Sequence, residues 1–112
     1  MNLSTMQCQS CRHGAQAITD QDLDTWLDQL DDWQLVTDKG VKKLQKAFKF
    51  KNYSQSMAFA NAVAQQAETE DHHPLMIIEY ACVNVVWWTH SINGLHQNDF
   101  ILAARTSALA IK

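Results

Sequence analysis

The sequence predicts an α+β fold in which a four-stranded antiparallel sheet carries three helices packed on one face. Two observations lead to this class. Helical segments alternate with pairs of strands in the order α-β-β-α-β-β-α, and short turn sequences join the strands of each pair. The 112 residues, 46% hydrophobic and 19% charged with three glycines and one proline, have globular composition. We therefore expect a single domain over residues 1–112, with a flexible N-terminal segment at 1–17.

The first helix is predicted over residues 18–30, and a β-hairpin over residues 33–50. Thr19 can cap the first turn of the helix, and four apolar residues then repeat at the spacing of one helical face: Leu23, Trp26, Leu27 and Leu30. In the hairpin, Asp38-Lys39-Gly40 supplies the turn, and lysines keep one face of the second arm polar.

The second helix is predicted over residues 52–70, with Asn52 as its cap. Its apolar stripe is expected to consist mostly of small side chains: Tyr53, Met57, Ala60, Val63, Ala64 and Ala67. Pro74 disfavours helical geometry at His73, so the helix should end near that residue. Two further strands follow, with a break near Ala81-Cys82, and then a last helix over residues 99–112.

The last strand carries apolar side chains on both of its faces. Alternation places Val83, Val85 and Trp87 on one face, and Val86 and Trp88 on the other. A sheet with helices on one side leaves its second face open, so the second pair predicts a contact with another subunit.

Charge and cysteine content exclude several classes of protein. The net charge of −3 gives no general attraction to nucleic acid or to an anionic membrane, and no apolar run is long enough to cross a bilayer. Aspartates crowd residues 20–32 and lysines crowd residues 39–51, which favours two solvated faces over a phosphate-binding patch. Three cysteines and the lack of a signal peptide favour the cytoplasm over secretion.

The N-terminal segment contains a Cys-x-x-Cys pair, Cys8 and Cys11, with His13 close by. Zinc would need four ligands at suitable spacing, and the sequence has no second pair of cysteines. We therefore expect no metal here, while metal binding through these residues stays an alternative.

Two adjacent histidines, His72 and His73, lie beside Glu68, Glu70 and Asp71. Nearby carboxylates raise the pKa of a histidine and orient its ring, which suits general acid/base catalysis. Metal binding and simple packing remain open as alternatives. A further histidine, His90, is expected at the end of a strand.

These residues form part of a longer pattern. The string ETEDHHP at residues 68–74, a later tyrosine, and WWTHSINGLHQND at residues 87–99 resemble the signature of the pterin-4a-carbinolamine dehydratases. Seven residues agree in order and spacing: Glu68, His72, His73, Pro74, Tyr80, His90 and Asp99. The resemblance extends over nearly the whole chain, and the Cys-x-x-Cys-Arg start is similar to bacterial members associated with phenylalanine hydroxylation.

The resemblance implies elimination of water from 4a-hydroxytetrahydrobiopterin, which yields a quinonoid dihydropterin and recycles the cofactor of aromatic amino acid hydroxylases. It implies His72 and His90 as the acid/base pair, with His73 holding and orienting the pterin. Glu68 and Asp99 would support the histidines, and Tyr80 and Trp88 would contact the substrate. Neither a metal nor a redox cofactor is expected.

The resemblance also implies a homodimer or homotetramer with a possible link to phenylalanine hydroxylase. A regulatory binding protein that uses the same fold is the alternative function, because some relatives act as cofactors of a transcription factor. In two places the sequence departs from the family: Met76 replaces an aromatic residue, and His96 replaces a small hydroxyl residue that caps the last helix.

Overall fold

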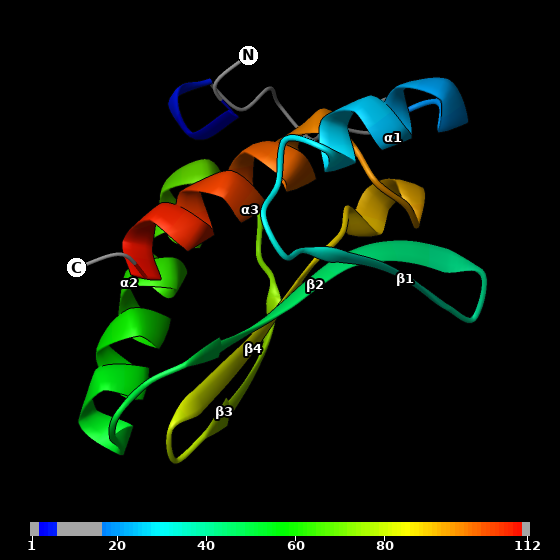
Figure 1. The fold of residues 1–112 in the computed structure, drawn as a ribbon. Helices are drawn as coiled ribbons and strands as arrows, with labels where there is room; N and C mark the ends of the chain where they lie inside the picture. The colour runs from blue at the N-terminus through cyan, green and yellow to red at the C-terminus, as the bar shows by residue number, and fades with distance from the viewer. Residues whose placement is uncertain (1–2, 7–16, 111–112) are drawn as a thin grey trace.

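The computed structural model describes residues 3–6 and 17–110, which form one antiparallel sheet and its covering helices (Figure 1). The elements in chain order are η1 (Leu3–Thr5), α1 (Asp20–Leu27), β1 (Gln34–Asp38), β2 (Val41–Lys49), α2 (Tyr53–Glu70), β3 (Leu75–Glu79), β4 (Cys82–Trp87), η2 (His90–Ile92) and α3 (Gln97–Ala110). The strand order is β1-β2-β4-β3. The predicted α+β class and its order of elements are confirmed. No helix in the described part of the chain is long and apolar enough to cross a membrane.

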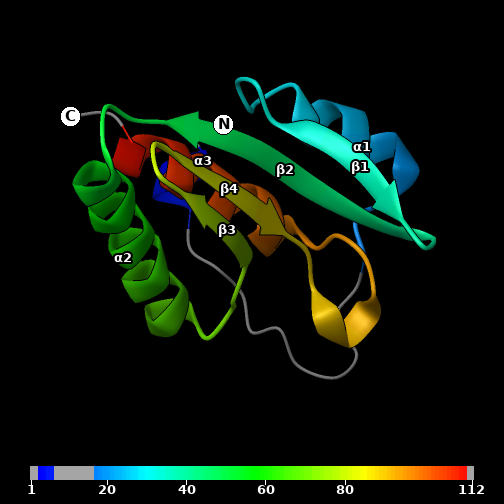
Figure 2. The same ribbon diagram turned by 90° about the horizontal axis from the view of Figure 1, so that it is seen from below.

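The sheet consists of two hairpins joined at its centre by β2 and β4. In the first hairpin, Lys39 and Gly40 both have positive φ angles, 52° and 80°, as a two-residue type I′ turn requires. In the central pairing, Leu44 lies opposite Trp87 and Phe48 lies opposite Val83, all on the face that the helices cover. Figure 2 shows α3 behind the sheet and α2 beside β3, with β3 at one free edge of the sheet and β1 at the other.

Both predicted helix caps are confirmed. The side chain of Thr19 accepts a hydrogen bond from the backbone N–H of Asp22 at 3.2 Å, and Asn52 accepts one from the N–H of Gln55 at 2.8 Å. Each cap thus gives a side-chain acceptor to an N–H in the first turn of its helix, and the N–H of Asp22 also donates to the Thr19 carbonyl at 3.1 Å.

The buried face of α2 differs from the predicted stripe. Tyr53 is 51% exposed and Ala64 is exposed, whereas the helix buries Ser56, Phe59, Ala60, Val63 and Ala67. The Phe59 ring sets this rotation, because it packs against Phe48 and Phe50 with centroid distances of 4.8 and 5.1 Å. The aromatic side chain that finds ring partners in the sheet therefore decides which face of α2 turns inward.

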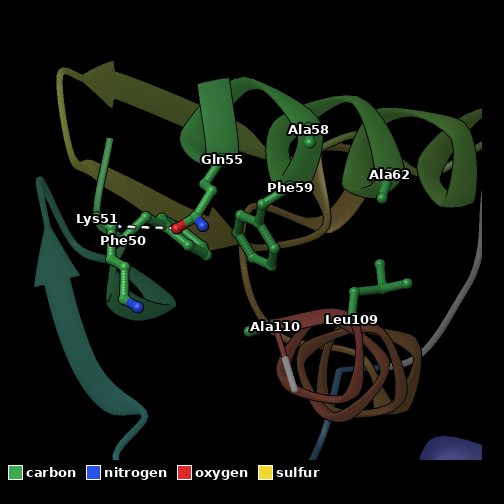
Figure 3. A pocket seen from close by; sticks show the side chains of 8 residues that line it. All are labelled: Phe50, Lys51, Gln55, Ala58, Phe59, Ala62, Leu109 and Ala110. Atoms are coloured by element: carbon green, nitrogen blue, oxygen red, sulfur yellow. Dashed lines mark hydrogen bonds between the residues drawn. The ribbon is translucent and has the colours of Figure 1, made fainter. Parts of the chain in front are cut away.

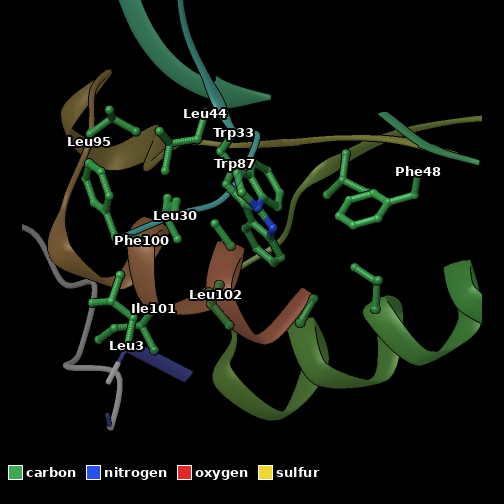
Figure 4. Close-up of a cluster of buried hydrophobic side chains, with 14 of the residues drawn as sticks. Leu3, Leu30, Trp33, Leu44, Phe48, Trp87, Leu95, Phe100, Ile101 and Leu102 are labelled. Atoms are coloured by element: carbon green, nitrogen blue, oxygen red, sulfur yellow. The ribbon is translucent and has the colours of Figure 1, made fainter. Parts of the chain in front are cut away.

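The core lies between the sheet and the helices (Figure 4). Leu44, Trp87 and Phe100 are fully buried there, as are Ile101 and Leu102 on α3. The ring of Trp26 meets Phe100 edge-on at 5.9 Å, which attaches α1 to α3.

Part of the N-terminal segment also packs on the domain. Leu3 is only 3% exposed and belongs to the core. Arg105 on α3 donates to the carbonyl oxygens of Ser4 and Met6 and pairs with the Glu70 carboxylate at 2.7 Å. Residues 3–6 of the segment expected to be flexible therefore lie against α3, while residues 1–2 and 7–16 are outside the described part.

Helix α2 ends at Glu70, and Asp71 after it adopts a left-handed conformation with φ 51° and ψ 43°. The N–H of Asp71 donates to the Glu68 carbonyl, and the N–H of His72 donates to the Ala67 carbonyl at 3.1 Å. This pair of bonds is the Schellman motif, which satisfies the last helical carbonyls and turns the chain sharply. The motif fixes the direction in which the chain enters the histidine pair.

We expect Asp71→Val to lower the free energy of unfolding by about 1–2 kcal/mol, because a β-branched residue is strained in the left-handed region. Asp71→Gly should leave stability unchanged or raise it, because glycine adopts this conformation freely. Urea unfolding of the two variants measures the difference. Thr69→Val, two residues earlier inside the helix, is the matched control and should change stability by less than about 0.5 kcal/mol. Equal stability of the two Asp71 variants would contradict this role.

Candidate active site

His72 is the buried member of the histidine pair, with 6% of its surface exposed. The end of α2 holds its backbone, and its ring lies over Trp87 at a centroid distance of 5.7 Å and an interplanar angle of 18°. Its Nε2 lies 2.7 Å from Oδ1 of Asp99, which is fully buried. The strand, the helix end and the carboxylate together restrict this ring to one orientation.

Asp99 lies in the first turn of α3 and completes a capping box. The N–H of His96 donates to Asp99 Oδ2 at 2.9 Å, and the N–H of Asn98 donates to Nδ1 of His96 at 3.1 Å. His96 therefore caps α3 in place of the small hydroxyl residue of the family, with an acidic residue three positions later bonding back to it. The helix dipole also favours a negative charge at Asp99.

The Asp99 carboxylate accepts three hydrogen bonds within this network. Oδ1 faces His72, and Oδ2 accepts from His96 and from the Thr89 hydroxyl, the latter at 2.7 Å. Because an ionised carboxylate only accepts, Nε2 of His72 is the donor, and the neutral ring carries its basic lone pair on Nδ1.

The two exposed histidines, His73 and His90, contact different kinds of side chain. Nε2 of His73 lies 2.5 Å from Oε2 of Glu68, one turn back on α2. His90 begins η2, and its ring lies 4.3 Å from Trp88. Nζ of Lys43 lies 4.1 Å from the centroid of the same tryptophan ring.

All three histidines border one cleft of about 220 Å³. The residues that line it are Asp71, His72, His73, Thr89, His90 and Ser91. Three imidazoles around a small cleft can both donate and accept protons near neutral pH. The sequence analysis did not single out Thr89. Alternation along the strand places it on the same side of the sheet as Trp87, and it directly precedes His90, so its position could have indicated a place in the site.

Two aromatic residues that were expected in the pocket lie elsewhere in this chain. Tyr80 is in the turn between β3 and β4, where it is 69% exposed and its carbonyl accepts from Ser56 near the start of α2. The histidines lie at the other end of that 18-residue helix. Trp88 contacts His90 but does not line the cleft.

A larger groove of about 380 Å³ lies between α2, α3 and the end of β2 (Figure 3). Phe50, Phe59 and Leu109 form its apolar walls, and Lys51 and Gln55 are its polar residues. No histidine, cysteine or acidic residue of the described part of the chain lines this groove, so the candidate active site is the smaller cleft.

Among the residues that the structure describes, no three histidine, cysteine or acidic side chains form a metal-binding group. Cys8, Cys11 and His13 lie outside the described residues, so metal binding there stays an alternative prediction.

Comparison with known proteins gives a consistent result. The family described as "Pterin 4 alpha carbinolamine dehydratase" matches residues 16–109. A Marinobacter nauticus protein is 46% identical over 108 residues, covering 96% of this chain and 97% of its own. A Vibrio cholerae protein is 44% identical over 107 residues, covering 96% and 98%. Both are named "Putative pterin-4-alpha-carbinolamine dehydratase".

Two solved structures share the fold. A Brucella melitensis protein described as a transcriptional coactivator/pterin dehydratase has a TM-score of 0.77 and 34% identity, covering 85% of this chain and 99% of its own. A pterin dehydratase-like protein, described as a RuBisCO assembly factor in the alpha-carboxysome, has a TM-score of 0.62 and 26% identity, covering 73% and 93%.

Burial lowers the pKa of His96, and the nearby His72 lowers it further, while the Asp99 carboxylate opposes both effects. The folded protein therefore resists protonation of His96 more than the unfolded chain does. The resulting stability is present above the unfolded pKa of about 6.5 and is lost as the pH falls below it.

We expect His96→Asn to flatten the decline in unfolding free energy below pH 6.5, because asparagine keeps a capping acceptor but does not titrate. Urea unfolding at several pH values, compared with the parent protein, measures the change. An identical pH dependence in both proteins would show that His96 does not contribute.

Proposed function

The chain belongs to the pterin 4 alpha carbinolamine dehydratase family, and we propose that it removes water from 4a-hydroxytetrahydrobiopterin by histidine general acid/base catalysis. The main support is the single cleft that His72, His73 and His90 share. Asp99 behind His72 and Glu68 behind His73 add the carboxylate partners that such histidines need.

In the proposed reaction, His72 takes the proton from N5 of the pterin through Nδ1. His90 donates a proton to the hydroxyl group on C4a, the C4a–O bond breaks, and water leaves as the C4a–N5 double bond forms. Asp99 stabilises the imidazolium that develops on His72. His73, held by Glu68, binds and orients the pterin ring.

The product is a quinonoid dihydropterin, which a reductase can return to the tetrahydro form. We place the protein in the cytoplasm, in support of an aromatic amino acid hydroxylase such as phenylalanine hydroxylase. The description of the Brucella melitensis structure also names a coactivator. A regulatory binding role is therefore the second candidate, although a binding module would not need the complete set of histidines.

We expect His72→Gln and His90→Gln each to reduce kcat by roughly a hundredfold to ten-thousandfold, the usual contribution of a general acid or base. Glutamine at position 72 retains a donor for Asp99, so the fold should persist. Stopped-flow measurement of 4a-hydroxytetrahydrobiopterin dehydration tests both variants. Lys49→Gln, an exposed change on β2, should behave like the parent. A parent protein without dehydratase activity would favour the regulatory candidate.

We also propose that the chain assembles through the free edge of β3. The large exposed apolar side chains at this edge are Leu75, Ile77, Ile78 and Tyr80, with 39–69% of their surfaces accessible. An exposed apolar edge strand is a template for pairing with another strand. A second copy of β3 fits best, because antiparallel pairing about a two-fold axis uses the same residues on both sides.

Ile77 is the central residue of β3, so two-fold pairing would place it near its own copy. Ile77→Asp would then bring two like charges together, which destabilises cross-strand pairs. We expect sedimentation velocity to show the parent as a dimer or larger and this variant as a smaller species. Thr37→Asp, at the opposite edge on β1, is the matched control. A monomeric parent would contradict the proposal.

A further inference from the structure

Thr89 lies where β4 ends, and its backbone is fixed on both sides. Its N–H donates to the Gly94 carbonyl at 2.8 Å, and the Gly94 N–H donates back at 3.3 Å, which forms an isolated antiparallel bridge. Its backbone angles, φ −101° and ψ 111°, are those of an extended strand. The residue is 2% exposed, so its side chain is almost completely enclosed by protein.

The Thr89 hydroxyl is directed at the carboxylate behind His72. Its oxygen lies 2.7 Å from Oδ2 of Asp99, and it must donate because the ionised carboxylate only accepts. The same Oδ2 accepts from the backbone N–H of His96 at 2.9 Å. One oxygen is thus held from two directions, by the end of β4 and by the start of α3, which leaves Oδ1 for His72.

We propose that Thr89 is a positioning residue for dehydration, acting on His72 through the Asp99 carboxylate. The inference rests on the proposed function, but the contact that it invokes can be measured without the reaction. With the hydroxyl present, two donors at Oδ2 and one at Oδ1 define the plane of the carboxylate. Without it, only the His96 N–H would hold Oδ2, and the carboxylate could rotate away from the His72 ring.

A threonine side chain is well suited to orienting the Asp99 carboxylate. β-Branching restricts the χ1 angle of threonine, so the direction of its hydroxyl is set by the backbone that the Gly94 bridge fixes. A charge-assisted hydrogen bond to a buried carboxylate is also about twice as strong as a neutral one. Valine has nearly the same shape as threonine but no donor, whereas serine keeps the donor and loses the methyl group.

The test compares Thr89→Val and Thr89→Ser with the parent protein by two measurements. The first is the ¹⁵N NMR signature of the His72 ring above neutral pH, which reports which nitrogen carries the proton. We expect the parent and Thr89→Ser to show the Nε2–H tautomer, and Thr89→Val to show a mixture of both tautomers. The second measurement is steady-state dehydration of 4a-hydroxytetrahydrobiopterin.

We expect Thr89→Val to reduce kcat by roughly tenfold to a hundredfold, the loss seen in metal sites when an outer hydrogen-bond partner of a ligating histidine is removed. KM should change less than about twofold, and Thr89→Ser should recover most of kcat. Ser107→Ala is the matched control, because its hydroxyl accepts from Trp33 at 2.9 Å instead of contacting this network. It should keep both the parent tautomer and the parent kcat.

The outcomes separate this inference from the proposed function. An unchanged His72 tautomer with an unchanged kcat in Thr89→Val would overturn the role of Thr89. A mixed tautomer in Thr89→Val, with a parent protein that lacks dehydratase activity, would support the contact and contradict the proposed function. A loss of kcat that Thr89→Ser does not recover would point to packing and would also overturn the role.

Discussion

The hydrogen bond between His72 and Asp99 is the interaction on which the candidate site depends. Both groups are buried, and removing a carboxylate from water costs several kcal/mol unless its oxygens are satisfied. The protein meets this requirement with three donors, which come from the end of α2, the end of β4 and the start of α3. The site therefore exists only where these three element ends meet, and the sheet order and helix packing bring them together.

The same residues that shape the site also begin and end the helices. Asp99 is the acidic member of the capping box of α3, and His72 supplies the last N–H of the motif that ends α2. A change at Asp99 removes a helix cap and the partner of His72 together. Stability and the geometry of the cleft are therefore coupled at this position, and activity loss alone cannot separate the two roles of the carboxylate.

Local patterns predicted the parts of this structure that depend on near neighbours. The caps at Thr19 and Asn52 and the turn at Lys39-Gly40 follow from short stretches of sequence, and the structure contains them. The rotation of α2 could not be predicted this way, because contacts of Phe59 with a strand decide it.

In the candidate site, too, contacts between near neighbours could be predicted from the sequence, and contacts between distant residues could not. The proximity of Glu68 to His73 follows from their spacing along one chain segment, and the structure places them in contact. The contact of Asp99 with His72 spans 27 residues. The sequence pointed to Asp99 only through the resemblance to a known family, which implied that it supports the histidines without saying which one. The role of Thr89 depends on where β4 ends in space, and the distance of Tyr80 from the cleft depends on where the β3–β4 turn lies. The periodicity of the sequence specifies neither position.

Two consecutive tryptophans, at the end of β4 and directly after it, give the two proposed proton carriers different surroundings. Trp87, at the end of β4, is fully buried and lies against His72, whereas Trp88, directly after the strand, is only partly buried and lies against His90. A ring that is buried against Trp87 and Asp99 keeps one orientation and meets little solvent. An exposed ring such as His90 can exchange protons with water between turnovers. This difference fits a base at His72, where the positive charge develops beside a fixed carboxylate, and an acid at His90. After each reaction His72 must release the proton that it took, and His90 must regain the proton that it gave.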